Sequence, residues 1–155
     1  MSLKDELMSE RVSHLDLSKF CQIPKGTAVR AALSEMRQNK TNVCLVTEGG
    51  SLVGILTERD VLTKVAATPE NLDVPVDDIM TANPIAVTPD TSAADALWLM
   101  DDKQFRNLPV VGRDGKIKGN MTHQAVISFL AARYPVEVLN RPPNPDLYPR
   151  KQEGG

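Results

Sequence analysis

The chain is poor in aromatic residues and in the residues that usually build metal and redox sites. Aromatic residues make up 4% of its 155 positions, and it has two histidines and two cysteines. His14 and His123 are isolated, without further ligands at zinc spacing, so we expect no metal and no catalytic residue among them. Cys21 and Cys44 lie in apolar stretches without metal-type spacing. We expect them to be reduced, buried thiols in a cytoplasmic protein.

Long apolar runs and an excess of basic charge are also missing. No run of 18 apolar residues occurs, and the N-terminal stretch MSLKDELMSERVSHLDLSKF has no apolar signal region. We therefore expect neither a membrane span nor a signal peptide. The 18 basic and 20 acidic residues give a formal net charge of −2. This charge argues against general nucleic-acid binding, although a local RNA-binding patch stays open.

The sequence also has no motif that indicates an enzyme. It contains no serine or cysteine nucleophile motif, no Walker-type loop and no convincing acid–base pair. What it does have is a length of 155 residues with 41% hydrophobic content, enough for one compact unit with a core. We expect no required cofactor.

The chain repeats itself at an offset of 65 residues. Residues 41–61, TNVCLVTEGGSLVGILTERDV, align without a gap to residues 106–126, RNLPVVGRDGKIKGNMTHQAV. About one or two identities are expected by chance over this length. Six of the 21 pairs are identical: Asn42/Asn107, Val46/Val111, Gly50/Gly115, Gly54/Gly119, Thr57/Thr122 and Val61/Val126. We infer an internal duplication.

Each copy predicts the order strand–helix–strand–strand–helix. A short apolar strand ends at a proline, in DLSKFCQIP and in PIAVTP. Apolar residues at helical spacing predict helices over 27–38 and 92–103. A hairpin with a Gly-rich turn follows, and a second helix begins at Thr57 or Thr122 and runs to about 66 or 132. The fold class is therefore α/β (α+β).

Two segments lie outside this pattern, a linker between the copies and a C-terminal tail with five prolines, expected to be extended or disordered. The expected organisation is an N-terminal helical arm over 1–14, a first repeat over 15–67, the linker over 68–83, a second repeat over 84–133, and the tail over 134–155.

Three stretches in this order, SLVGILTERDV, VDDIMTANPIAVTPDTSAADALWLM and FRNLPVVGRDGKIKG, resemble a tandem pair of cystathionine-β-synthase-type (CBS) domains. The resemblance covers about residues 15–133. It implies two β-α-β-β-α repeats related by a pseudo-twofold axis, forming one Bateman-type module. It further implies a regulatory role, binding of adenosine-containing ligands between the copies, and pairing of two chains through helices of both repeats. Trp98 and Phe129, on predicted helices, are the candidate anchors of that homodimer.

The stretch GILTERD allows two interpretations. Thr57 can cap a helix, with Asp60 as its reciprocal partner in a capping box. Alternatively, Thr57 donates to a phosphate at the helix N-terminus and Asp60 accepts from two ribose hydroxyls, while Gly54 leaves room for the ligand. The second copy keeps Thr122 but has Ala125 in place of the aspartate. Asp60 is therefore not needed for the cap, and a ligand would explain it.

By the resemblance, the residues that open the other copy's hairpin complete the cleft, here Arg106 and Asn107. Arg106 can bind phosphate through two hydrogen bonds, whereas the first copy has the uncharged Thr41 there. Four apolar residues form the expected adenine wall, with core packing as the alternative: Pro84, Ile85, Ile55 and Leu56. A second, weaker cleft would have Thr122 and His123.

The sequence thus predicts a regulatory module that binds AMP, ADP or ATP. S-adenosylmethionine or NAD in the same cleft remains an alternative, although Arg106 favours a phosphate over a sulfonium cation. A ligand-free dimeric scaffold that recruits an unknown regulated protein is the other alternative.

Overall fold

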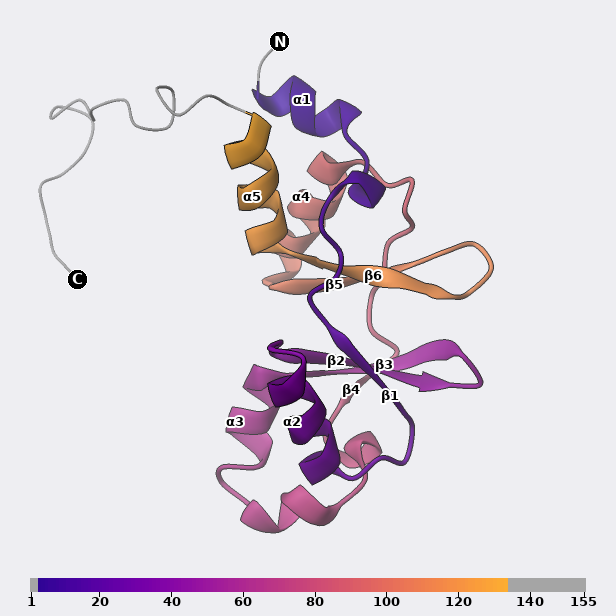
Figure 1. Ribbon diagram of the computed structural model, residues 1–155, viewed down its shortest axis with the longest axis vertical. Helices are drawn as coiled ribbons and strands as arrows, with labels where there is room; N and C mark the ends of the chain where they lie inside the picture. The colour runs from indigo at the N-terminus through magenta and orange to yellow at the C-terminus, as the bar shows by residue number, and fades with distance from the viewer. Residues whose placement is uncertain (1–2, 134–155) are drawn as a thin grey trace, which may run out of the picture.

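The computed structural model describes residues 3–133, which form two stacked halves (Figure 1). The lower half in that view contains β1 (Cys21–Pro24), α2 (Val29–Gln38), β2 (Val43–Glu48), β3 (Ser51–Thr57), α3 (Glu58–Lys64) and β4 (Thr81–Ala82). The upper half contains α1 (Leu3–Ser9), α4 (Ala93–Lys103), β5 (Asn107–Val111), β6 (Ile117–Thr122) and α5 (His123–Arg133). Three short 3-10 helices complete the elements: Val12–His14, Pro69–Asp73 and Val76–Asp78.

The strands of the two halves lie toward the middle of the molecule, and the helices lie outside them (Figure 1). The first sheet has the order β1-β2-β3-β4, with β1 parallel to β2 and the other pairs antiparallel. The second consists of the antiparallel pair β5 and β6. Ile117 of β6 packs against the buried cluster of Val43, Leu45 and Ile55, so the two halves share an apolar contact.

The predicted duplication is confirmed in the fold. Each half has a helix, a hairpin and a second helix in the same order, and each hairpin has one register shift, at Val46/Thr47 and at Val110/Val111. Each half also has its own buried core. Ala32, Val46 and Leu56 belong to the first core, and Ala96, Val110 and Met121 to the second. The predicted mixed α+β fold is therefore correct.

The strand predicted at the start of the second copy, over residues 84–89, is not present. Instead of a strand over 84–89, the structure has a single parallel bridge between Val87 and Val110. The Val87 nitrogen donates to Pro109 O at 3.0 Å, and the Val111 nitrogen donates to Val87 O at 2.8 Å. Pro84 and Pro89 have no N–H to donate, so the pairing does not extend to them.

The segment predicted as a linker contributes to the first core. Val76 and Ile79 are buried there, and β4 adds a fourth strand beside β3. The Val76 nitrogen donates to Thr27 O at 2.7 Å, which ties the segment to the start of α2. The sequence did not predict that residues 68–83 join the first core, because this stretch contains only isolated apolar residues.

The N-terminal arm packs against the second repeat. Leu7, Val12 and Leu15 are part of the second core. Arg133 at the end of α5 forms an ion pair with Glu6 at 2.9 Å, joining the two ends of the described chain. After Leu15 the chain passes along β6, where Ser18 bridges Asn120, and then enters β1 of the first half.

Cys21 and Cys44 form a disulfide, which contradicts the expectation of reduced thiols. The two residues are register partners in the parallel pair of β1 and β2, and their Cα atoms lie 4.7 Å apart. This separation lies within the range that a disulfide requires. The pairing of two strands 23 residues apart creates this proximity, and the cysteine spacing does not reveal it.

None of the helices within residues 3–133 combines the length and the apolar character needed to cross a membrane. The predicted tail over 134–155 and the first two residues of the arm lie outside the described residues.

Candidate functional site

Thr57 and Asp60 form a complete capping box at the start of α3. The Asp60 nitrogen donates to Thr57 Oγ1 at 3.3 Å, and the Thr57 nitrogen donates to Asp60 Oδ2 at 3.0 Å. The Thr57 hydroxyl also donates to Asp60 Oδ2, at 3.1 Å. The predicted helix start is therefore correct, and Asp60 takes part in it although Glu or Gln is usual at that position.

The other carboxylate oxygen of Asp60 is only loosely held. Its Oδ1 lies 3.4 Å from Lys64 Nζ, and the Lys64 side chain is 43% exposed. The Asp60 side chain itself is 14% exposed. Lys64 Nζ also donates to Ile79 O at 2.8 Å, so the longer contact with Asp60 can be lost while the ammonium keeps a partner. Asp60 Oδ1 can therefore accept a new donor without disturbing the capping box.

The start of α3 attracts an anion less than the sequence suggests. The helix has seven residues, Glu58–Lys64, rather than the predicted run to about residue 66. A shorter helix sums fewer peptide dipoles at its N-terminus. Any phosphate contact at this place depends on side chains more than on the helix.

The second copy confirms that the threonine cap does not need an aspartate. Thr122 Oγ1 accepts from the Ala125 nitrogen at 3.0 Å, directly before α5. Ala125 itself is buried in the second core. No carboxylate stands at this position to bind a ribose, so the two copies differ as the sequence indicates.

Gly54 does not leave open space for a ligand, contrary to expectation. A Cβ built at Gly54 would collide with the thioether of Met80, so that side chain fills the position. Leu56 is fully buried in the first core, and Ile55 belongs to the cluster between the halves. The side chains of Ile55 and Leu56 therefore pack in the core, which is the alternative interpretation of these two residues.

Arg106 and Asn107 lie at the beginning of β5 with donors that the described residues leave unused. Arg106 is exposed and, within residues 3–133, has neither an ion pair nor a hydrogen bond. Asn107 is half-buried, and its Oδ1 accepts from Asn120 Nδ2 at 3.1 Å. Over the same residues, Asn107 Nδ2 has no acceptor.

The matching pair in the first copy is satisfied internally. Asn42 Nδ2 donates to Glu58 Oε2 at 3.4 Å, and Thr41 Oγ1 accepts from the Val43 nitrogen at 3.4 Å. His123 takes the position of Glu58 in the second copy. The second copy therefore presents an unused cation and an unused amide nitrogen where the first copy has no cation and an amide that already donates to Glu58.

The structure does not join the predicted site residues by direct contacts. Across the described range, no hydrogen bond or ion pair links Arg106 or Asn107 to Thr57 or Asp60. Pro84 is half-buried, and Ile85 is exposed, with 42% of its surface accessible. Ile85 is thus an apolar side chain that the described residues leave partly uncovered.

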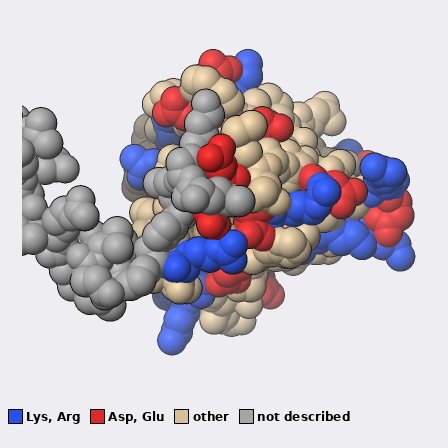
Figure 2. Space-filling model, turned by 90° about the horizontal axis from the view of Figure 1, so that it is seen from above, with Lys and Arg blue, Asp and Glu red and all other residues tan. Residues whose placement is uncertain are grey.

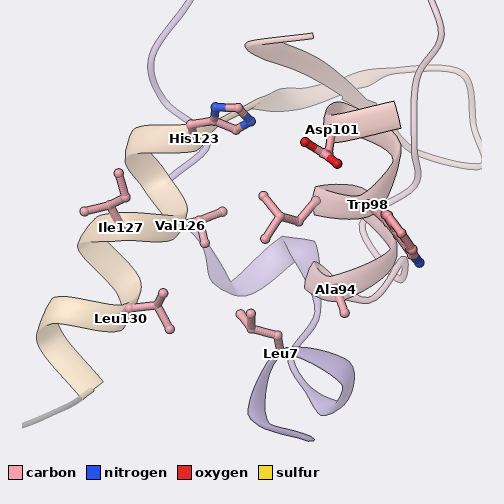
Figure 3. A pocket seen from close by; sticks show the side chains of 9 residues that line it. Leu7, Ala94, Trp98, Asp101, His123, Val126, Ile127 and Leu130 are labelled. Atoms are coloured by element: carbon pink, nitrogen blue, oxygen red, sulfur yellow. The ribbon is translucent and has the colours of Figure 1, made fainter. Parts of the chain in front are cut away.

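A second feature is an apolar groove on the second half, with a volume of about 950 Å³ (Figure 3). Trp98 of α4 lies on one side and Ile127 of α5 on the other, and the two are 70% and 56% exposed. Nine residues line the groove: Leu7, Ala94, Leu97, Trp98, Asp101, His123, Val126, Ile127 and Leu130. His123 therefore borders this groove as well as following Thr122.

Phe129, the other predicted interface aromatic, lies differently. It packs against the second core, and the Arg133 guanidinium lies 5.3 Å from its ring centroid. Of the two candidates, Trp98 is the more accessible.

Neither the face seen in Figure 2 nor the His, Cys, Asp and Glu side chains of residues 3–133 show a nucleic-acid or a metal site. On the face seen in Figure 2, acidic and basic side chains are interspersed and form no patch of one sign. Among residues 3–133 no three His, Cys, Asp or Glu side chains come together as a metal-binding group.

Comparison with known families identifies the domain that is repeated in the chain. The CBS domain model matches the chain twice, over residues 6–67 and 76–132. The chain belongs to the CBS domain family. The two matches correspond to the two sequence repeats, although residues 6–15 pack on the second half and residues 76–82 on the first. The predicted resemblance is confirmed.

Curated relatives carry the same family name. The CBS domain-containing protein CBSCBSPB5 of Arabidopsis thaliana is 41% identical over 114 residues, which cover 72% of this chain and 21% of that protein. The chain thus spans about a fifth of that plant relative's length. An uncharacterized 17.7 kDa protein of Acidianus ambivalens is 33% identical over 113 residues, covering 72% of this chain and 68% of that protein.

Solved structures show the same fold. A conserved protein from Pyrococcus horikoshii has a TM-score of 0.74 at 23% identity, covering 83% of this chain and 97% of that one. CBSX2, solved in complex with AMP, has a TM-score of 0.71 at 24% identity, covering 81% and 100%. The CBS pair of protein MJ0100, solved with 5-methylthioadenosine and S-adenosyl-L-methionine, has a TM-score of 0.70 at 22% identity, covering 80% and 98%.

One polar residue near the predicted site was missed by the sequence reasoning. Asn120 is fully buried on β6, next to Asn107, and its Oδ1 has no hydrogen-bond partner. The repeat alignment contains its signal, because the first copy has the apolar Ile55 at the same position.

Proposed function

We propose that this chain is a regulatory module that binds one adenosine nucleotide, AMP, ADP or ATP, between its two repeats. The observation that carries the proposal is the unused pair of donors at Arg106 and Asn107. In the first copy, the Asn42 amide donates to Glu58, and Thr41, which accepts from the Val43 nitrogen, carries no charge. An exposed guanidinium beside a free amide is suited to a phosphate, which accepts both kinds of hydrogen bond.

The ribose contact of the proposed site is assigned to Asp60. Its Oδ2 remains in the capping box with Thr57, while Oδ1 exchanges the exposed Lys64 for a ribose hydroxyl. The Thr57 hydroxyl turns its single proton from Asp60 Oδ2 to the phosphate, while the two backbone hydrogen bonds of the capping box remain. Ile85 and Pro84 cover one face of the base. The second cleft, with Thr122 and His123, lacks a carboxylate for the ribose and binds more weakly or not at all.

Two of the similar structures support an adenosine ligand by what they contain, AMP in CBSX2 and 5-methylthioadenosine with S-adenosyl-L-methionine in MJ0100. The charge of Arg106 favours the phosphate-containing ligand, because a sulfonium cation would be repelled by it. S-adenosylmethionine and NAD are therefore the alternatives to test beside the three nucleotides.

We further propose that the module works as a homodimer and regulates another protein rather than catalysing a reaction. The exposed Trp98 and Ile127, on the two sides of an apolar groove, provide a surface that a second copy would cover. A nucleotide that contacts both repeats favours the arrangement that brings Arg106 toward Thr57. It shifts that equilibrium only by the difference in its affinity for the two arrangements.

A thermal-shift panel tests this proposal with AMP, ADP, ATP, S-adenosylmethionine and NAD on the wild type. A ligand at 100 times its dissociation constant stabilises the fold by about 2.7 kcal/mol. For a chain of this size the melting temperature then rises by roughly 5–10 °C. A rise with at least one adenine nucleotide supports the proposal. No rise with any of the five ligands would favour the ligand-free scaffold instead.

A further inference from the structure

Asn120 occupies a position that ordinarily takes an apolar residue. It is fully buried in the middle of β6, between Gly119 and Met121, which are also buried. The first copy has Ile55 at the aligned position, where it packs into the cluster between the halves. An asparagine there leaves one buried oxygen, Oδ1, without a partner. A buried unpaired acceptor lowers stability, so the side chain requires a reason beyond packing.

The nitrogen of the same amide joins two separate segments. Asn120 Nδ2 donates one hydrogen bond to Lys19 O and one to Asn107 Oδ1, each at 3.1 Å. The backbone of Asn120 also donates to Leu17 O at 2.9 Å. Leu17 and Lys19 belong to the stretch that leads into β1 of the first repeat, whereas Asn107 begins β5 of the second.

These contacts fix which way each amide points. The Lys19 carbonyl can only accept, so it must face the nitrogen of Asn120 and not the oxygen. The second hydrogen on that nitrogen then meets Asn107, which must turn its own oxygen toward it. Asn107 Nδ2 is thereby directed away from Asn120, with its two N–H groups unused within the described residues.

We propose that Asn120 is a positioning residue for the nucleotide site: it holds the Asn107 amide with its nitrogen toward the ligand, beside Arg106, so that Asn107 donates to the phosphate. This inference rests on the proposed function, since it assigns a role within that site. Without Asn120, the Asn107 amide can rotate and present its oxygen, which repels a phosphate. In the first copy, where Ile55 stands in place of Asn120, the Asn42 amide has no such partner and its nitrogen is used by Glu58.

The test measures AMP and adenosine affinities for wild type, Asn107→Ala, Asn120→Ile and the double variant by calorimetry. Asn120→Ile introduces the residue of the first copy. We expect each single variant to weaken AMP binding by about 10-fold, which corresponds to the lower range for a hydrogen bond to a charged group. Adenosine binding should change less than twofold, and the double variant should match Asn107→Ala. Equal losses for AMP and adenosine, additive losses, or no loss in Asn120→Ile would overturn the proposal.

A second measurement needs no variant and remains valid if Asn120→Ile fails to fold. In the wild type, addition of AMP should shift the side-chain amide resonances of Asn107 in a nitrogen–proton correlation spectrum, whereas adenosine should shift them much less. Unchanged Asn107 resonances at saturating AMP would contradict the role of Asn120 while leaving nucleotide binding intact. If AMP, ADP and ATP all fail to bind the wild type, the proposed function fails, and this inference fails with it.

Discussion

Asp60 accepts a hydrogen bond from the Thr57 nitrogen at 3.0 Å through one carboxylate oxygen and reaches the exposed Lys64 only through the other. One residue can therefore stabilise the start of α3 and still bind a ligand. We predict that Asp60→Ala lowers the free energy of unfolding by about 1 kcal/mol, as expected for the loss of a helix cap. Urea unfolding without ligand measures this loss.

The same variant should also bind the nucleotide at least 10-fold more weakly, because a ribose contact to a charged acceptor is lost. Glu58→Ala is the matched control, since it removes a carboxylate from the same turn. It should retain the affinity. If Asp60→Ala loses stability but binds as well as the wild type, Asp60 is a capping residue and nothing more.

Gly54 and Met80 provide a second prediction. A methyl group at position 54 would collide with the Met80 thioether, the flexible end of that side chain, so Gly54→Ala should lower the free energy of unfolding by about 1 kcal/mol. Met80→Ala in the same chain should relieve much of that loss, giving a double variant more stable than the sum of the single effects. Thermal unfolding of the four proteins measures the coupling. Additive effects would show that Met80 does not fill the space over Gly54.

The disulfide between Cys21 and Cys44 gives a third prediction. It closes a loop of 23 residues, for which the loss of chain entropy in the unfolded state corresponds to about 3 kcal/mol. Cys44→Ala should therefore lower the melting temperature by roughly 6–12 °C. A thiol assay on unfolded, unreduced wild-type protein should find no free thiol, and two free thiols per chain would contradict the pairing.

The groove between α4 and α5 gives a fourth prediction. If a second copy covers it, Trp98→Asp places a charge in an apolar interface and should convert a dimer to a monomer in sedimentation experiments. Arg113→Asp is the matched control. The Arg113 side chain is 88% exposed in the turn between β5 and β6, outside the helices that form the proposed interface. A wild type that is already monomeric, or a dimer that survives Trp98→Asp, would exclude this surface as the interface.

The sequence predicted those features that depend on local signals. The repeat, the two hairpins and the threonine caps at Thr57 and Thr122 each follow from residues close together in the chain. The strand over 84–89 was overpredicted because its two prolines remove the donors that a longer pairing needs.

The missed features depend on which distant segments meet. Cys21 lies beside Cys44, and Met80 fills the space over Gly54, only because β1, β4 and their neighbours pair in one sheet. Asn120 was overlooked because a single polar residue in a strand carries no information about its partners. Its contacts with Lys19 and Asn107 arise from segments 101 and 13 residues away.

The central claim is that Arg106 helps to bind the phosphate of an adenosine nucleotide. Calorimetric titration of AMP and ATP into wild type, Arg106→Ala and Arg113→Ala tests it most directly. Arg113 is an exposed arginine at the tip of the same hairpin, so its replacement removes the same charge from a different place. We predict one nucleotide per chain for wild type and Arg113→Ala, and an affinity about 10–100-fold lower for Arg106→Ala. Equal affinities in all three proteins, or no binding to the wild type, would contradict the claim.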